Sequence, residues 1–209
     1  QPEKLKNHEF LAELKSLHAD LQVVVAFRML PEQVWNMTPM GTVNLHASLL
    51  PDYRGAAPIN WAIIRGEEKT GLTTFKLKHD IDTGNILLQE EMSIGPDETA
   101  GELHDRMMVT GAQLLLHTIR GLAEGTLTEE PQGHSSHQKH APKIYTDTCS
   151  INWNMPVENV YNLIRGLSPF PGAFTKLHGK ILKIYSAEKE IIPVNEAPGE
   201  YSIEKGRLK

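Results

Sequence analysis

Three polar side chains alternate with apolar ones in the segment Asn44-Leu45-His46-Ala47-Ser48. In a β-strand, side chains two positions apart share a face, so Asn44, His46 and Ser48 would point the same way. Amide and imidazole groups on one face can donate hydrogen bonds to an oxygen that gains charge during a reaction. The alternative is that these groups bond neighbouring backbone and hold the following loop, because buried polar groups generally find partners.

A second polar cluster, His79-Asp80-Ile81-Asp82-Thr83-Gly84, follows a later strand-like run. Asp82 before Thr83-Gly84 predicts a tight turn that directs the carboxylate into a cleft, although an aspartate that only bonds its own turn is the commoner use. A carboxylate near an imidazole orients the ring and favours its protonated form. Asn44, His46 and Asp82 therefore indicate acyl-type chemistry on a carbonyl, with donors for an oxyanion and an acid–base pair.

Two other interpretations of the polar residues are weaker. Ser48 stands two residues from His46 on the same strand and has no G-x-S-x-G turn around it, which disfavours a nucleophilic serine. His134, His137 and His140 could approach a metal ion, but their run holds no cysteine or carboxylate. We therefore expect a solvated loop there and no metal.

Length and composition predict a globular protein of one domain or slightly more: 209 residues, 40% hydrophobic and 22% charged. The longest apolar runs are too short to span a bilayer and no secretory leader opens the sequence, so we expect a cytoplasmic protein without a membrane segment. Cys149 is the lone cysteine and is expected to be a buried apolar residue. Residues 1–142 carry 12 basic and 19 acidic side chains, residues 143–209 carry 9 and 7, and this asymmetry does not by itself indicate nucleic-acid binding.

Hydrophobic periodicity predicts the elements that must position these clusters. Strands are expected over residues 21–27, 41–48, 72–78 and 86–92. Helices are expected over residues 7–18, 31–37, 58–66 and 99–124. The last helix begins with the capping-box spacing of Thr99 and Glu102. This alternation predicts an α/β domain with a mostly parallel sheet, and ligands bind such sheets beyond the carboxyl ends of the strands.

The final third of the chain has a different character. Residues 126–145 are rich in proline, glycine, serine and histidine, which is typical of a linker. A short helix over 156–167 and a hairpin of 173–177 with 180–186 follow, joined at His178-Gly179. We therefore divide the chain into a catalytic domain (1–125), a linker (126–145) and a partial β-domain (146–209).

The segment from residue 44 to 59 resembles the signature of the folate-dependent formyltransferases; it reads NLHASLLPDYRGAAPI. Residues 81–84, IDTG, are similar to the aspartate loop of that family, and residues 24–31, VVAFRMLP, are similar to the strand and loop that line its folate pocket. Three segments in the same order make the resemblance specific. It extends over the whole chain and is strongest between residues 21 and 122.

The resemblance implies a Rossmann-like formyltransferase domain followed by a small OB-like β-domain. Residues 54–59, and residues 141–144 leading to 151–153, are similar to the family members that formylate initiator methionyl-tRNA. The proline-rich corner at 167–173 resembles the entry to their OB-like domain, which helps to hold tRNA. In the family, an earlier strand and helix and a loop that grips the tRNA precede this point, so we expect the sequence to be part of a longer protein.

The resemblance also implies a role for each matching residue. Asn44, His46 and Asp82 would be catalytic. The folate would contact Ser48, Leu49, Leu50 and Pro51 and the backbone of Arg28 and Leu30. The co-substrate would be 10-formyltetrahydrofolate, the acceptor initiator methionyl-tRNA, and the enzyme a monomer that needs no metal. An amino-sugar nucleotide as acceptor, hydrolysis of the folate to release formate, and a non-catalytic folate-binding module are the alternatives.

Overall fold

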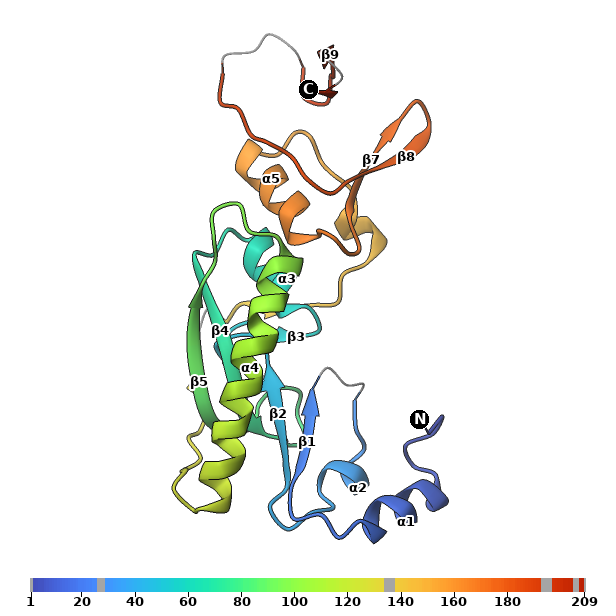
Figure 1. The fold of residues 1–209 in the computed structure, drawn as a ribbon. Coiled ribbons are helices and arrows are strands. Elements are labelled where there is room, and N and C mark those ends of the chain that lie inside the picture. The colour runs from blue at the N-terminus through green and yellow to red at the C-terminus, as the bar shows by residue number, and fades with distance from the viewer. Residues whose placement is uncertain (1, 26–28, 134–137, 193–196, 205–206, 209) are drawn as a thin grey trace.

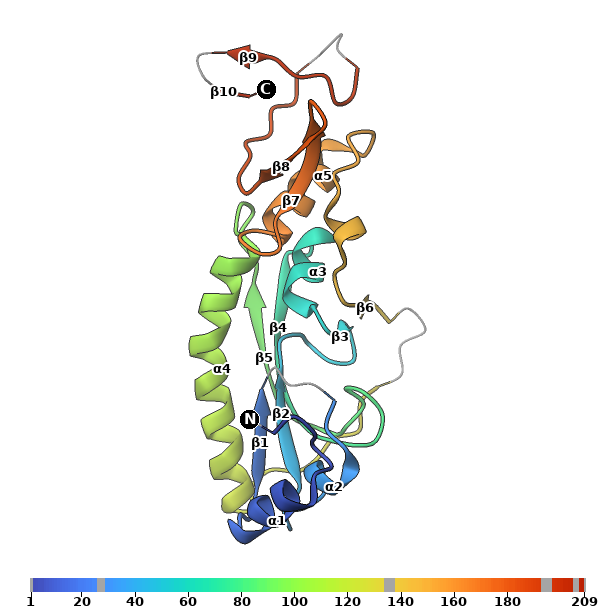
Figure 2. The ribbon, with the colours of Figure 1, turned by 90° about the vertical axis from the view of Figure 1, so that its right-hand side faces the viewer.

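A four-stranded sheet with the order β1-β2-β4-β5 forms the centre of the computed structural model, which describes residues 2–25, 29–133, 138–192, 197–204 and 207–208 (Figure 1). Its strands are β1 (Gln22–Val25), β2 (Thr42–His46), β4 (Lys69–Lys76) and β5 (Ile86–Ser93). The long helix α4 (Ala100–Ala123) lies along one face of this sheet in both ribbon views (Figures 1 and 2). The α/β class predicted from the alternation of elements is thereby confirmed.

The sheet is mixed, which corrects the prediction that it is mostly parallel. β1 and β2 pair in parallel, whereas β2 with β4 and β4 with β5 are antiparallel. A parallel pair needs a crossover long enough to bring the chain back, and the loop between β4 and β5 contains no helix. The sequence already offered this signal, because the loop at 79–84 stood directly between two strand-like runs.

Helix α4 begins at the predicted capping box and packs closely on the sheet. The Thr99 hydroxyl accepts a hydrogen bond from the Glu102 backbone, and the Glu102 carboxylate accepts one from the Thr99 backbone. A side chain at Gly111 would lie 2.8 Å from Leu45 Cδ2, so the helix backbone approaches β2 directly. Leu45 therefore faces α4, and Asn44 and His46 face the opposite side of the sheet.

The N-terminal elements form as predicted but lie at the rim of the molecule. Helix α1 (His8–Ser16) is capped by the Asn7 side chain and buries none of its residues. Helix α2 (Glu32–Trp35) begins one residue after Pro31, which is its N-cap. β1 ends at Val25, and residues 26–27 of the predicted strand lie outside the described residues.

The predicted linker returns to the catalytic half of the chain. Glu130 forms an antiparallel bridge with Ile86 at the start of β5. Further along, β6 (His140–Ala141) pairs in parallel with β3 (Arg54–Gly55), just before helix α3 (Pro58–Ile64). Tyr53 and Ala141 belong to the same buried core as the inner face of α4. The linker is therefore packed against the loop that follows β2.

The C-terminal part has a second, smaller core of Cys149, Ile151, Ile164, Leu167 and Ala173. Its elements are a 3-10 turn η1 (Thr146–Cys149), helix α5 (Val157–Gly166), the hairpin β7 (Ala173–Leu177) with β8 (Lys180–Ile184), and the pair β9 (Ile203–Glu204) with β10 (Arg207–Leu208). The hairpin and the buried Cys149 confirm the sequence predictions. A closed OB-like barrel stays a prediction, because the strands described here form two separate two-stranded sheets.

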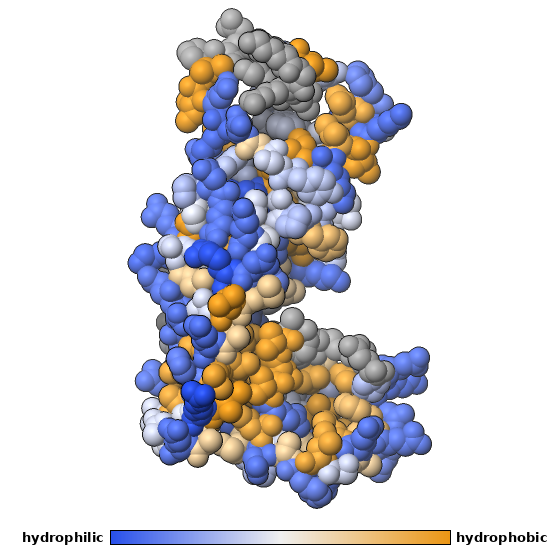
Figure 3. Space-filling model, viewed as in Figure 1, coloured by the Kyte–Doolittle hydropathy of each residue, from blue (hydrophilic) through white to orange (hydrophobic). Residues whose placement is uncertain are grey.

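Apolar side chains gather on the surface in the lower half of the view, around α4 and β1 (Figure 3). The exposed apolar side chains of these two elements include Val23, Val25, Val109 and Leu116. None of the helices within the described ranges is both long enough and apolar enough to cross a membrane.

Candidate active site

His46 occupies the last position of β2, and both of its ring nitrogens face polar groups. Nε2 lies 2.9 Å from the carbonyl oxygen of Tyr53, and Nδ1 lies 4.0 Å from Oδ2 of Asp82. A carbonyl oxygen can only accept a hydrogen bond, so Nε2 carries a proton in this contact. Nδ1, which faces Asp82, is then the nitrogen that can gain or lose a proton. The ring is 6% exposed and its edge packs against Phe75.

Asp82 lies in the tight turn that its sequence predicted, with a left-handed backbone at φ 53°. Its Oδ2 accepts a hydrogen bond of 2.9 Å from the backbone N–H of Gly55. The 4.0 Å between this oxygen and His46 Nδ1 exceeds a direct hydrogen bond, so the carboxylate acts on the imidazole through its charge. Two segments far apart in sequence thus bring an acid–base pair together.

Asn44 lies two positions before His46 on the same face of β2. Its side chain is 4% exposed, and its Oδ1 is buried without a hydrogen-bond partner among the described residues. A buried amide left without a partner costs about 1–3 kcal/mol. Such a group is explained when a ligand, rather than the protein, completes its hydrogen bonds. The arrangement of Asn44, His46 and Asp82 can therefore hold a polar ligand and move a proton.

Ser48 departs from the shared face that the sequence predicted. β2 ends at His46, and the Ser48 hydroxyl turns to donate a 2.6 Å hydrogen bond to the carbonyl oxygen of Asp52. The serine is fully buried, so its hydroxyl holds the turn that follows the strand. The strand stops here because Thr73, on β4, bonds the Ser48 carbonyl through its side chain instead of continuing the ladder.

The other residues of the predicted folate-binding loop, Leu49, Leu50 and Pro51, follow in this turn. Leu50 is buried, and its backbone N–H donates to Thr73 Oγ1 at 3.1 Å while its carbonyl accepts from Gln89 Nε2 at 2.9 Å. Sequence reasoning missed Thr73 and Gln89, which fix this loop from β4 and β5. A contact between the loop and folate stays a prediction.

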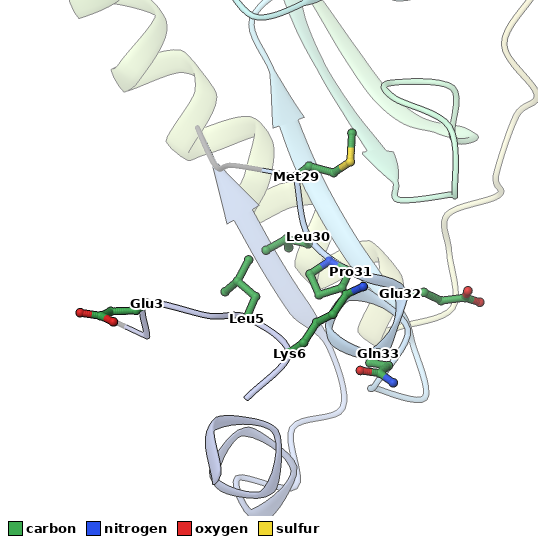
Figure 4. A pocket seen from close by; sticks show the side chains of 8 residues that line it. All are labelled: Glu3, Leu5, Lys6, Met29, Leu30, Pro31, Glu32 and Gln33. Carbon is green, nitrogen blue, oxygen red and sulfur yellow. The ribbon is translucent and has the colours of Figure 1, made fainter. Parts of the chain in front are cut away.

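The remaining predicted folate contacts lie elsewhere. Arg28 is outside the described residues. Leu30 lines a cavity of about 640 Å³ between the N-terminal segment and the start of α2 (Figure 4). The residues around this cavity are Glu3, Leu5, Lys6, Met29, Leu30, Pro31, Glu32 and Gln33. Leu30 is the one member of this set that the sequence assigned to the site, so the cavity does not join it to His46 and Asp82.

Tyr53 is a further residue beside the candidate site whose contacts sequence reasoning missed. Its hydroxyl donates to Glu67 at 2.5 Å, and Lys139 of the linker binds the same carboxylate. The Arg65 guanidinium lies 5.3 Å from the ring centroid. Burial and the hydrogen bond to Glu67 raise the pKa of Tyr53, so the phenol stays protonated. The anchored side chain holds the Tyr53 carbonyl at its place beside His46.

Burial alone would raise the pKa of Glu67, but the hydrogen bonds from Lys139 and Tyr53 hold it below its ordinary value. Glu67 is therefore a carboxylate at neutral pH and accepts from both neighbours. Tyr53 lies within the signature segment 44–59, and this position is the one sequence signal that could have drawn attention to its bond with Glu67.

A metal site is not formed by the side chains that the structure describes. They contain no group of three or more His, Cys, Asp and Glu residues placed to hold an ion. Of the histidine triplet in the linker, His134 and His137 lie outside the described residues, and His140 is exposed within β6.

Two family models match this chain. The formyl transferase model matches residues 1–119, and the model of the formyl transferase C-terminal domain matches residues 143–208. A methionyl-tRNA formyltransferase of Parabacteroides distasonis is 54% identical over 198 residues, which are 90% of this chain and 61% of the relative. The chain thus spans about three-fifths of the length of such curated relatives.

Solved structures share the fold at lower identity. HypX from Aquifex aeolicus in complex with tetrahydrofolic acid has a TM-score of 0.75 at 21% identity and covers 93% of this chain and 34% of that one. Methionyl-tRNA formyltransferase from Clostridium thermocellum has a TM-score of 0.69 at 20% identity, over 98% and 82% of the two chains. Since the N-terminal model alone accounts for more than half of the residues, the chain belongs to the formyl transferase family.

Proposed function

We propose that this chain carries the active site of an enzyme that transfers the formyl group of 10-formyltetrahydrofolate to the amino group of initiator methionyl-tRNA. The observation that carries the proposal is the meeting of His46 and Asp82, 4.0 Å apart, on the face of β2 where the buried Asn44 Oδ1 has no partner among the described residues. The 54% identity to a methionyl-tRNA formyltransferase supports this acceptor.

The bond-forming step needs donors at the formyl oxygen. The amine nitrogen attacks the formyl carbon, a C–N bond forms, and the carbonyl oxygen becomes an oxyanion. The Asn44 side-chain N–H would donate to it, and the His46 ring would donate through Nδ1–H once that nitrogen has taken up a proton. One such donor contributes about 3–4 kcal/mol to transition-state stabilisation. Holding the amine and the formyl donor side by side supplies a further share of the rate.

The path of the transferred proton follows from the different contacts of the two imidazole nitrogens of His46. Nε2 stays bonded to the Tyr53 carbonyl, so Nδ1 takes the proton that the attacking amine loses. The Asp82 carboxylate stabilises the resulting imidazolium at 4.0 Å. When the bond between the formyl carbon and N10 of the folate breaks, Nδ1 delivers this proton to N10. Atoms and charges then balance without a covalent enzyme intermediate.

The remaining parts of the chain take supporting roles in this proposal. Residues 1–125 form the catalytic domain, in which the loop at 48–51 and the backbone of Leu30 and Arg28 bind the folate. Residues 126–145 are the linker, and residues 146–209, whose net charge is positive, help to hold tRNA. Because tRNA is used in translation, we place the enzyme in the cytoplasm.

One assay tests the acceptor. The intact protein is offered 10-formyltetrahydrofolate with charged initiator tRNA, with an amino-sugar nucleotide, or with water alone, and each product is quantified. We expect formylation of the tRNA. Formylation of the sugar alone would assign a different acceptor, and release of formate alone would assign a hydrolase. Folate binding without turnover in any arm would leave a binding module.

The same assay tests the catalytic residues. His46→Ala and Asp82→Asn should each lower kcat by about 10²–10⁴-fold, because the proton transfer loses its base or its charge partner. Asn44→Ala should lower kcat by about 10²–10³-fold, the effect of one oxyanion donor. His117→Ala is the matched control, since this histidine is exposed on α4. Near-normal turnover of a folded His46→Ala protein would refute the mechanism.

A further inference from the structure

We propose that Gln132, a linker residue, is a positioning residue of this active site. Its side-chain amide joins the turn that carries Asp82 to the β3 segment, and through this bridge it sets the place of the Asp82 carboxylate beside His46. The proposal rests on the proposed function. Gln132 lies between the segments matched by the two family models, so neither of those matches covers it.

The Gln132 amide uses its donors and its acceptor at once. Nε2 donates to the carbonyl oxygens of Asp82 and Gly84, each at 2.8 Å. Oε1 accepts from Arg54 Nε at 3.1 Å and also from Nη2 of the same guanidinium. The half-buried amide thus connects a turn at 82–84 with an arginine on β3. An apolar side chain of the same length would leave two carbonyl groups of the turn without this donor.

Backbone hydrogen bonds hold the linker in place both before and after Gln132. Before it, Glu130 exchanges two backbone hydrogen bonds with Ile86, at 2.7 and 2.9 Å, directly beyond the Asp82 turn. After it, β6 pairs with β3, so that His140 is opposite Arg54 and Ala141 opposite Gly55. The linker is therefore attached to β5 on one side of Gln132 and to β3 on the other.

Asp82 has few other restraints. Its backbone has the left-handed conformation at φ 53°. This conformation costs a non-glycine residue about 1–3 kcal/mol and persists only where the surrounding structure holds it. Neighbouring Asp80 and Ile81 are exposed, and the turn is closed on itself by the Thr83 hydroxyl, which donates to Asp80 at 3.0 Å. The two bonds from Gln132 thus restrain the peptide planes that follow Asp82 and Gly84.

A small displacement of this turn would move the Asp82 carboxylate relative to His46. Among the described residues, the Asp82 carboxylate accepts one hydrogen bond, from the Gly55 N–H, and it lies 4.0 Å from His46 Nδ1. Misplacing a reacting group by about 1 Å can cost on the order of 100-fold in rate. A purely structural role for Gln132 would instead lower stability and leave the turnover of the folded protein unchanged.

The test compares two variants of Gln132 with a matched control in the intact protein. Gln132→Met removes every hydrogen bond, and Gln132→Glu keeps the acceptor for Arg54 but removes the donors to the turn. Gln113→Met, on the exposed side of α4, is the control. We expect both Gln132 variants to remain folded at the assay temperature and to lower kcat by about 10–100-fold, with KM for folate and tRNA within about twofold. Wild-type kcat in the folded Gln132→Glu protein would overturn the proposal.

A double-mutant cycle separates positioning from independent effects. In an Asp82→Asn background, Gln132→Met should lower kcat by less than about twofold, because its effect is transmitted through Asp82. The same loss in both backgrounds would overturn the proposal.

Hydrogen exchange of the Gly55 amide, which donates to Asp82, gives a readout that needs no activity. We expect faster exchange in Gln132→Met and unchanged exchange in Gln113→Met. If the wild-type protein transfers no formyl group but the Gly55 amide still exchanges faster in Gln132→Met, the proposed function alone is refuted. If exchange of this amide is the same in Gln132→Met and in the wild type, the role of Gln132 is refuted.

Discussion

Two regions of the molecule are built in different ways. The site corner, formed by Tyr53, Arg54, Gly55, Asp82 and Gln132, joins three segments far apart in sequence through side-chain and backbone hydrogen bonds. The β1 edge, formed by α1, β1 and α2, holds regular elements with little burial: α1 buries no residue, and Val25 of β1 is 52% exposed. Well-formed local structure is therefore not what positions the candidate catalytic groups.

The comparison shows where a substitution should matter. In the site corner, each polar group has a partner on another segment, so one change leaves a partner unsatisfied or pushes a neighbouring backbone. At the β1 edge, the elements depend mostly on their own caps and backbone bonds. Changes there should be local, because little apolar surface is lost when they loosen.

The largest expected effect is that of Gly55→Ala. Gly55 has φ 123°, and an added Cβ would overlap the backbone carbonyl of Ala141 on β6. Backbone strain and overlap with a group that cannot move aside should lower the free energy of unfolding by about 3 kcal/mol or more. Urea unfolding measures this loss. Gly133→Ala in the linker is the control, because no described residue lies within 4 Å of its added Cβ. Equal losses in the two variants would contradict the comparison.

An intermediate effect is expected at Glu67, which holds Tyr53 and Lys139. The pKa of Glu67 is below its usual 4.5 in the folded protein, so its contribution to stability is complete above pH 4.5 and is lost as the pH falls below that value. Glu67→Gln should cost about 1.5–3 kcal/mol at pH 7, the range for a hydrogen bond to a charged group. Its unfolding free energy should also depend less on pH below 4.5. Parallel curves for the two proteins would contradict this role.

The smallest effects should come from the two helix caps, which form a matched pair. Thr99→Ala removes the capping box of α4 and should cost about 1 kcal/mol in global unfolding, because α4 carries seven of its residues into the protein interior. Asn7→Ala removes the equivalent cap of α1 and should change global unfolding by less than about 0.5 kcal/mol, while amides of α1 exchange faster. Equal global losses would show that α1 is packed more firmly than its burial indicates.

Much of the candidate site could be predicted from local patterns. The period of two over residues 44–46 placed Asn44 and His46 on one face, and the residues after Asp82 predicted a tight turn there. Ser48 was assigned to that face as well, and this was wrong, because the strand ends where the Thr73 side chain takes over the backbone bonds. A strand end set by a side chain from another strand leaves no local signal.

The partners of the site residues were outside the reach of the sequence. The Tyr53 carbonyl fixes which nitrogen of His46 is protonated, and Gln132 bonds the Asp82 turn from a linker 50 positions away. Neither residue stands out by type or spacing, since a backbone carbonyl is present at every position and a linker glutamine is ordinary. The antiparallel sense of β4 and β5 was predictable in principle from the helix-free loop between them.

By itself, the sequence determined the element types, the face of β2 that carries the amide and imidazole, and the family signature. These depend on periodicity, capping and turn chemistry, which act between residues a few positions apart. Tertiary structure decided that Asp82 meets His46, which carbonyl accepts the imidazole proton, and that the linker returns to the site. Those features depend on hydrogen bonds between distant segments, and such bonds form when packing of the whole chain brings their donors and acceptors within reach.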